Sequence, residues 1–174
     1  MEKIAKIAQI GESVLRDRAT PVTTIDRQLV ESLIATAIAN NGVGIAAPQI
    51  ANSQRLFIVT SHPSDRYPNA PTMQPTAMIN PKIISHGTQT VKDWEGCLSV
   101  PNVRGLVPRY QEIKVEYTTI DGEAKRDVLT DFIARIFQHE LDHLDGILFV
   151  DRVESKEDLY TETEYLIKVA SGKH

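Results

Sequence analysis

The sequence has a single cysteine, no long apolar segment and no excess of positive charge. The lone cysteine, Cys97, excludes an intramolecular disulfide and indicates a reducing compartment. No stretch approaches the run of about 18 apolar residues that a membrane-spanning helix needs. Lys and Arg number 19 against 23 Asp and Glu, which gives a net charge of −4. We therefore expect no membrane partner and no direct nucleic-acid partner, whose phosphates this average charge would repel.

The length of the chain fits one domain better than two. Its 174 residues are 41% hydrophobic and 24% charged, which is ordinary for a globular protein and excludes an intrinsically disordered chain. The first residues, Met1–Lys6, resemble neither a signal peptide nor a transit peptide. We expect a monomeric, cytoplasmic protein with one domain over residues 1–174, in which residues 153–174 form a C-terminal tail that is helical in part.

Apolar residues at three- and four-residue spacing predict two clear helices and a weaker one. The clear helices cover residues 26–40 and 130–146, and a Gly or Asn-Gly signal ends each of them. The third helix is predicted over residues 158–170. Its apolar stripe would consist of Leu159, Leu166, Ile167 and Ala170.

Strands are predicted over residues 54–60, 77–84, 113–119 and 124–129. The last two flank an Asp-Gly turn and form the strongest hairpin signal of the chain. Pro81 interrupts the strand at 77–84 and predicts that it lies at a sheet edge. Residues 61–75 contain four prolines and are predicted to form a long surface loop. Because strands and helices are segregated along the chain, we expect an α+β fold.

The sharpest motif is His139-Glu140-Leu141-Asp142-His143, which lies in the second predicted helix. Spacing of four places both imidazoles on one helix face, where they can reach a single divalent ion. Glu140 lies roughly 100° round the helix from His139, close enough to act on a metal-bound water without ligating the ion. Such a pattern arises by chance on the order of 0.01 times in a chain of this composition.

A metal site of this kind needs a third ligand, and the sequence offers alternatives. Phe149 stands where a metzincin has its third histidine, which excludes that class. Glu162 and Glu164 lie near the distance expected of a gluzincin-like endopeptidase, and Cys97 is the other candidate. A metal-bound interaction module without catalytic activity is a further interpretation.

Three segments together resemble the peptide deformylase family. They are the sequences GVGIAAPQ at Gly42–Gln49, EGCLS at Glu95–Ser99 and QHELDH at Gln138–His143. Ile45 stands where leucine is usual in the family. The resemblance extends over about residues 7–152, and three ordered motifs are far more specific than any one of them.

The resemblance implies a catalytic domain in which antiparallel sheets pack around the helix with the HExxH motif. It places a metal ion on Cys97, His139 and His143, with a fourth position open for water. The implied ion is Fe²⁺, for which Zn²⁺, Ni²⁺ or Co²⁺ can substitute. The implied reaction removes the formyl group from the N-terminal formyl-methionine of nascent polypeptides and releases formate. The metal-bound water is then the nucleophile and Glu140 the general base.

The resemblance also implies further site residues. The Gln49 side-chain amide and the Leu98 backbone N–H would stabilise the developing oxyanion. The substrate-binding residues would be Val43, Gly44, Glu95, Gly96, Arg104 and Ile136. Within that set, Glu95 and Arg104 are expected to form an ion pair. Val43, Ile136 and the ring of His139 are expected to form an apolar pocket for the methionine side chain.

Asp142, within the third of these segments, and the C-terminal tail carry further expectations. Asp142 is expected either to orient a side chain such as Arg109 or to lie on the helix surface. Some family members carry a basic C-terminal helix proposed to dock on the ribosome. Residues 151–174 here contain 4 Lys and Arg against 6 Asp and Glu, so the acidic tail argues against ribosome association by that route.

Overall fold

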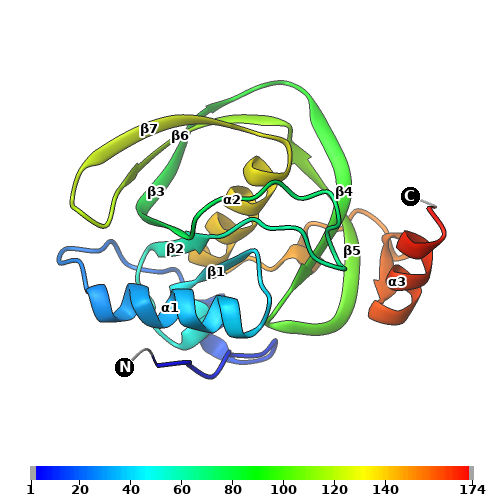
Figure 1. The fold of residues 1–174 in the computed structure, drawn as a ribbon, viewed down its shortest axis with the longest axis horizontal. Helices are drawn as coiled ribbons and strands as arrows, with labels where there is room; N and C mark the ends of the chain where they lie inside the picture. Colours follow the sequence, from blue (N-terminus) through cyan, green and yellow to red (C-terminus); the bar gives the residue numbers. More distant parts are fainter. Residues whose placement is uncertain (1–2, 173–174) are drawn as a thin grey trace.

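Helix α2 (Asp131–Leu144) runs through the middle of the molecule, and two antiparallel sheets enclose it (Figure 1). The computed structural model describes residues 3–172. The larger sheet has the order β1-β2-β3-β6-β7 and the smaller one the order β4-β5-β8. This arrangement confirms the predicted α+β fold with antiparallel sheets around the helix that carries the HExxH motif.

The strands of the larger sheet are β1 (Gly44–Ala46), β2 (Leu56–Val59), β3 (Thr76–His86), β6 (Glu112–Thr118) and β7 (Ala124–Thr130). Those of the smaller sheet are β4 (Thr90–Cys97), β5 (Val100–Tyr110) and β8 (Leu159–Thr161). Within the described residues, the other α-helices are α1 (Arg27–Ala39) and α3 (Glu162–Ala170).

The apolar side of α2 packs on the larger sheet. Phe137 meets Phe57 of β2 edge to face, with ring centroids 5.1 Å apart, a geometry that aromatic pairs favour. The polar side of α2 is buried as well, since His139, Glu140 and His143 are at most 9% exposed. Buried polar groups are retained where other elements or ligands satisfy them, so this side of α2 is the candidate location of a functional site.

Helix α1 covers the opposite face of the larger sheet, where Leu33 packs with Ile45 and Ile58. It begins after Asp26, whose carboxylate accepts hydrogen bonds from the backbone N–H groups of Gln28 and Leu29 and so caps the helix. The bounds of α1 and α2 confirm the helices predicted over 26–40 and 130–146.

The hairpin of β6 and β7 is also confirmed. Its turn contains Gly122 with a φ of +84°, a conformation that glycine adopts without strain. Residues 61–75 contain neither helix nor strand, as their prolines predict.

The sequence predicts that the strand around Pro81 lies at a sheet edge, and this prediction is wrong. Strand β3 lies between β2 and β6. The register of β3 against β6 shifts between Ile79 and Lys82, so the proline falls in an irregularity of the ladder. A residue without an N–H is tolerated there because the regular hydrogen-bond pattern is already interrupted.

The predicted third helix is shorter than expected. Residues 159–161 form strand β8, and α3 begins only at Glu162. Its predicted apolar stripe is wrong, since Leu166 and Ile167 are 40% and 64% exposed whereas Tyr165 is 2% exposed. Helix α3 lies outside the sheets, beside β5 (Figure 1). Over residues 3–172, the structure contains no helix with the length and apolar character that a bilayer crossing requires.

Candidate metal centre and active site

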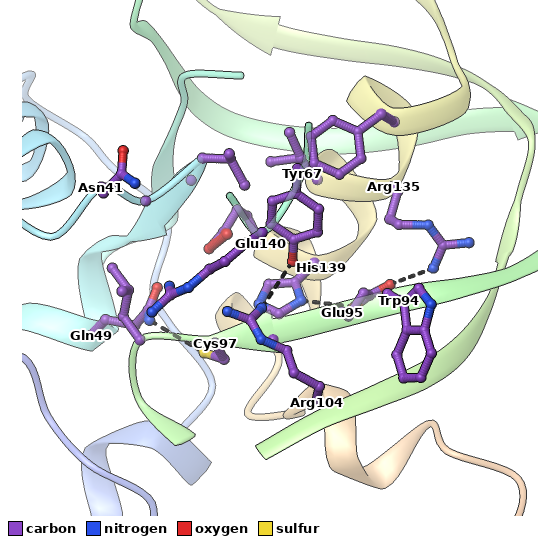
Figure 2. A pocket seen from close by; sticks show the side chains of 18 residues that line it. Asn41, Gln49, Tyr67, Trp94, Glu95, Cys97, Arg104, Arg135, His139 and Glu140 are labelled. Atoms are coloured by element: carbon purple, nitrogen blue, oxygen red, sulfur yellow. Dashed lines mark hydrogen bonds and ion pairs between the residues drawn. The ribbon is translucent and has the colours of Figure 1, made fainter. Parts of the chain in front are cut away.

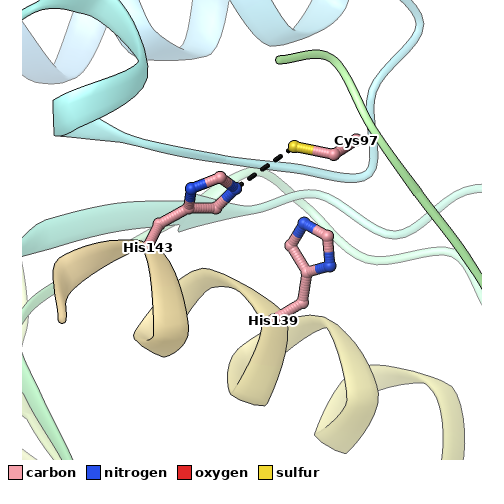
Figure 3. A group of neighbouring side chains, drawn as sticks. All are labelled: Cys97, His139 and His143. Carbon is pink, nitrogen blue, oxygen red and sulfur yellow. Dashed lines mark hydrogen bonds between the residues drawn. The ribbon is translucent and has the colours of Figure 1, made fainter. Parts of the chain in front are cut away.

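Three potential metal ligands converge between α2 and the end of β4. Cys97 is the last residue of β4, and His139 and His143 lie one turn apart on α2 (Figure 3). Their donor atoms all lie within 4.8 Å of one another, and Cys97 Sγ is 3.2 Å from His143 Nε2. Metal–ligand bonds of about 2.0–2.3 Å place the donors of one tetrahedral ion roughly 3–4 Å apart. A thiolate and two imidazoles at this spacing therefore fit a divalent transition-metal ion.

The protonation of the two histidines bears on this fit. Burial lowers the pKa of His143 well below its ordinary value and favours the neutral form that a metal ligand needs. Burial also lowers the pKa of His139, but hydrogen bonding to Cys97 and Glu95 outweighs this effect and raises it. A cation bound by the same donors competes with that proton, as is usual for thiolate and imidazole ligands.

Glu95 holds His139 from the side that faces away from Cys97. Its Oε1 accepts a hydrogen bond from His139 Nδ1 at 2.8 Å, and such a bond leaves Nε2 as the ligating nitrogen. Arg109 donates to the same carboxylate at 2.8 and 2.9 Å. Arg135 also donates to it, at 2.7 Å (Figure 2). Burial alone would raise the pKa of Glu95, but the charge of Arg109 and the hydrogen bonds hold it well below its usual range.

Arg109 extends this buried network to Asp142. Its Nη1 lies 2.6 Å from Asp142 Oδ2, which is the first of the two arrangements expected for Asp142. Arg152 donates to the same carboxylate at 2.9 Å. The network links β4, β5 and α2 through charges that would be costly to bury singly.

The predicted ion pair between Glu95 and Arg104 is wrong. The Glu95 carboxylate is occupied by Arg109, Arg135 and His139. Arg104 instead pairs with Glu162, with Nε 2.7 Å from Oε2. A sequence pattern within β4 and β5 does not reveal this choice, because the partner comes from α3 near the end of the chain.

Glu140 lies in the same pocket as Cys97 and His139, two of the three candidate ligands (Figure 2). Its side chain is buried, and Oε1 has no hydrogen-bond partner among the described residues. Burial raises the pKa of Glu140 to about 7. An unpaired buried carboxylate oxygen with this pKa is suited to exchanging a proton with a bound molecule.

Gly44 leaves room for Glu140. A Cβ at Gly44 would lie 2.7 Å from Glu140 Oε2 and 2.9 Å from Ile136 Cγ2, so a side chain there would displace the carboxylate. Gly44 begins β1, which is an edge strand of the larger sheet. An edge strand beside a pocket can pair with an extended peptide.

Gln49 approaches the ligands from the opposite side of the pocket. Its Oε1 accepts a hydrogen bond from Ala46 N–H at 2.9 Å, which turns the amide nitrogen toward the site. That nitrogen lies 3.0 Å from Ser99 Oγ and 3.6 Å from Cys97 Sγ. Leu98 follows Cys97 at the same rim, and its carbonyl accepts a bond from Gln9.

One pocket contains nearly all the residues that the sequence singled out (Figure 2). Its lining includes Val43, Gly44, Gln49, Glu95, Gly96, Cys97, Leu98, Arg104, Ile136, His139 and Glu140. The functional roles of these residues stay predictions. Sequence reasoning missed Arg66, Tyr67, Phe132 and Arg135, which line the same pocket.

The alternative ligands are engaged elsewhere. Glu162 binds Arg104 and Arg66, and Glu164 accepts a hydrogen bond from Thr161. Within residues 3–172, Cys97, His139 and His143 form the one group of three or more His, Cys, Asp or Glu residues arranged to share an ion. The gluzincin-like arrangement is therefore not formed.

Comparison with known proteins agrees with this geometry. The family model described as polypeptide deformylase matches residues 4–158. The chain is 58% identical over 167 residues to peptide deformylase 2 of a Nostoc species, covering 94% of this chain and 93% of that one. It is 44% identical over 154 residues to peptide deformylase 2 of Shewanella oneidensis, covering 87% and 85%.

Solved structures give the same result. A class I type b peptide deformylase from Acinetobacter baumannii, crystallised with Met-Ala-Ser bound, is similar with a TM-score of 0.86 and 45% identity. The match covers 88% of this chain and all of that one. The peptide deformylase of Thermotoga maritima is similar with a TM-score of 0.78 and 39% identity, covering 88% and 100%.

Proposed function

Because this chain belongs to the peptide deformylase family, we propose that it hydrolyses the formyl amide of N-terminal formyl-methionine on nascent polypeptides and releases formate. The observation that carries this proposal is the convergence of Cys97 with His139 and His143 beside Glu140. Three protein ligands that leave a position open are typical of catalytic rather than structural metal sites. In this proposal, residues 1–174 form one catalytic domain.

Cys97, His139 and His143 are the residues that would hold the ion. A divalent metal there supplies Lewis acidity, which polarises the formyl carbonyl and lowers the pKa of water. We propose Fe²⁺ as the native ion, with Zn²⁺, Ni²⁺ or Co²⁺ as substitutes, because this donor set suits several of them. Glu95 would keep His139 in the ligating tautomer through its 2.8 Å hydrogen bond.

Glu140 would act as the general base. It takes a proton from the attacking water as the bond between the water oxygen and the formyl carbon forms. It then returns a proton to the amine nitrogen as the carbon–nitrogen bond breaks. The Gln49 amide and the Leu98 backbone N–H would donate to the oxygen on which negative charge develops.

The substrate would enter as an extended strand along β1. The Acinetobacter baumannii relative was crystallised with the peptide Met-Ala-Ser, which supports a peptide that begins with methionine. Val43 and Ile136 line the pocket and would contact the methionine side chain. We place the enzyme as a monomer in the cytoplasm, where nascent chains are made, without ribosome docking through its acidic tail.

Formate release from formyl-Met-Ala-Ser tests this proposal. We expect release by the metal-loaded protein, loss of release with a chelator, and recovery when the metal is returned. Acetyl-Met-Ala-Ser is the matched control, because a tight site for the formyl group should reject the additional methyl. Release that survives complete metal removal, or equal turnover of the acetyl peptide, would contradict the proposal.

A further inference from the structure

Arg104 links three parts of the chain at the edge of the pocket. Its side chain is 4% exposed, and its Nε lies 2.7 Å from Glu162 Oε2 of α3. Its Nη1 donates to the hydroxyl of Tyr67 at 3.1 Å (Figure 2). Tyr67 belongs to the proline-rich segment 61–75. A buried guanidinium on β5 therefore joins α3 to that segment.

Helix α3 also holds the proline-rich segment directly. Glu162 Oε1 lies 3.3 Å from Arg66 Nε, and the Tyr165 hydroxyl donates to the backbone carbonyl of Arg66. The Tyr165 ring is 2% exposed and packs against Trp94 of β4 at 5.0 Å between ring centroids. Two residues of α3 thus fix Arg66 through both its side chain and its backbone.

These contacts determine the shape of the pocket. Arg66, Tyr67 and Arg104 all line it together with Cys97 and Glu140. Segment 61–75 has no helix or strand, so its conformation depends on contacts with its neighbours.

Arg104 and Tyr67 are held tightly on their other sides. Arg104 lies so close over Gly96 that a Cβ at Gly96 would come within 1.8 Å of Arg104 Nη1. The Tyr67 ring packs on Phe132 with ring centroids 4.8 Å apart.

The supporting residues lie beyond the part of the chain that matches the family model. The family model matches residues 4–158, whereas Glu162 and Tyr165 follow that stretch. We propose that α3 is a support for the pocket wall, in which Glu162 and Tyr165 are positioning residues that act through Arg104 and Tyr67. They set the affinity for the peptide and leave the chemical step unchanged. This inference rests on the proposed function for the identity of the ligand.

The chemistry of the contacts indicates what their loss would do. Without the Glu162 carboxylate, the Arg104 guanidinium is left buried and without its charged partner, and it gains from moving toward water. Arg66 loses its partner at the same time. The expected effect is therefore a local displacement of Arg104 and of segment 61–75, not the loss of the central fold around α2.

The first test is the kinetics of Glu162→Gln with formyl-Met-Ala-Ser. We expect KM to rise by about threefold to tenfold, with kcat and metal content unchanged. Glu164→Gln is the matched control, because Glu164 lies on the same helix and its side chain hydrogen-bonds only with Thr161 among the described residues. An unchanged KM in Glu162→Gln, or a fall in kcat without a rise in KM, overturns the proposal.

The second test does not depend on turnover. We expect trypsin to cleave after Arg66 about fivefold faster or more in Glu162→Gln and in Tyr165→Phe than in the parent or Glu164→Gln. Tyr165→Phe keeps the buried ring and removes only the hydroxyl that binds Arg66. Calorimetry with Met-Ala-Ser should give weaker binding in both variants. Faster cleavage with unchanged peptide affinity would show that α3 holds the segment without setting affinity, and this result overturns the proposal.

The two tests separate this inference from the proposed function. If the parent protein released no formate, the proposed function would fail, while cleavage rates and Met-Ala-Ser affinities would still decide the role of α3. Should the parent bind no Met-Ala-Ser at all, the inference fails as well.

Discussion

Glu95 accepts a hydrogen bond from His139 Nδ1 at 2.8 Å while two arginines hold its carboxylate in place. A buried charge network is therefore tied directly to a candidate metal ligand. The orientation of His139 depends on an acid that follows Trp94 on β4, 44 residues earlier in the chain.

Replacing Glu95 with glutamine should weaken metal binding by about tenfold to a hundredfold. The reason is that His139 Nδ1 then loses the carboxylate acceptor that orients the imidazole. It should also lower the free energy of unfolding by about 3 kcal/mol, since Arg109 and Arg135 lose a buried charged partner. Metal titration and urea unfolding measure the two effects. Glu112→Gln, on the exposed surface of β6, is the control, and equal metal affinity in both variants would contradict the role of Glu95.

Replacing Glu140 with glutamine should lower kcat by about 10²–10⁴-fold. The amide is close in shape to the carboxylate but cannot take a proton from water. Metal content and the unfolding transition should stay at parental values, because Glu140 is not among the three converging ligands. Turnover within about threefold of the parent would show that another group serves as the base.

Replacing Gly44 with alanine should lower both activity and stability. The new Cβ would lie 2.7 Å from Glu140 Oε2 and 2.9 Å from Ile136 Cγ2, and overpacking of this kind costs about 1–3 kcal/mol. Gly87→Ala is a matched control, because a Cβ there meets its nearest neighbours at 3.8 Å. Formate release and the unfolding temperature should therefore be lower in Gly44→Ala than in Gly87→Ala. Parental activity in Gly44→Ala would contradict this packing.

Asp151 should contribute to stability in a pH-dependent way. Burial would raise the pKa of Asp151, but hydrogen bonds from Arg16 and from the Leu148 backbone N–H outweigh it and lower the pKa below 3.8. The contribution is thus fully present above the ordinary pKa and is lost as pH falls through the lowered value. Because the pair with Arg16 is 48% and 39% exposed, we expect only about 0.5–1 kcal/mol.

Urea unfolding of the parent and of Asp151→Asn between about pH 3 and pH 7 measures this contribution. The difference between the two should be largest near neutral pH and should shrink in acid. A difference that grows as pH falls would have the wrong sign for a carboxyl group with a lowered pKa.

The sequence predicts those parts of the fold that depend on local pattern. Residues close together in the sequence suffice to predict helices α1 and α2 from their apolar spacing, and the turn between β6 and β7 from its Asp-Gly pair. The HExxH segment could likewise be placed on a helix, because residues four apart share one face of it. As the candidate third ligand, Cys97 could be chosen over Glu162 only with the help of the family resemblance.

Other features depend on contacts between distant segments. The strand that contains Pro81 can lie inside the sheet because the β3–β6 ladder is irregular at the proline. This irregularity involves pairing with a distant strand, so the local sequence does not predict it. Arg104 pairs with Glu162 of α3, whereas the carboxylate of Glu95 is held by Arg109 and Arg135. Tyr67 lies in a proline-rich loop with no motif, so only the folded chain places it in the pocket.

X-ray absorption at the metal edge tests the central claim most directly. For the metal-loaded protein we predict one sulfur and two imidazole nitrogens among the ligands, and loss of the sulfur in Cys97→Ser. A spectrum without sulfur in the parent, or an unchanged spectrum in Cys97→Ser, would contradict a metal ion shared by Cys97, His139 and His143.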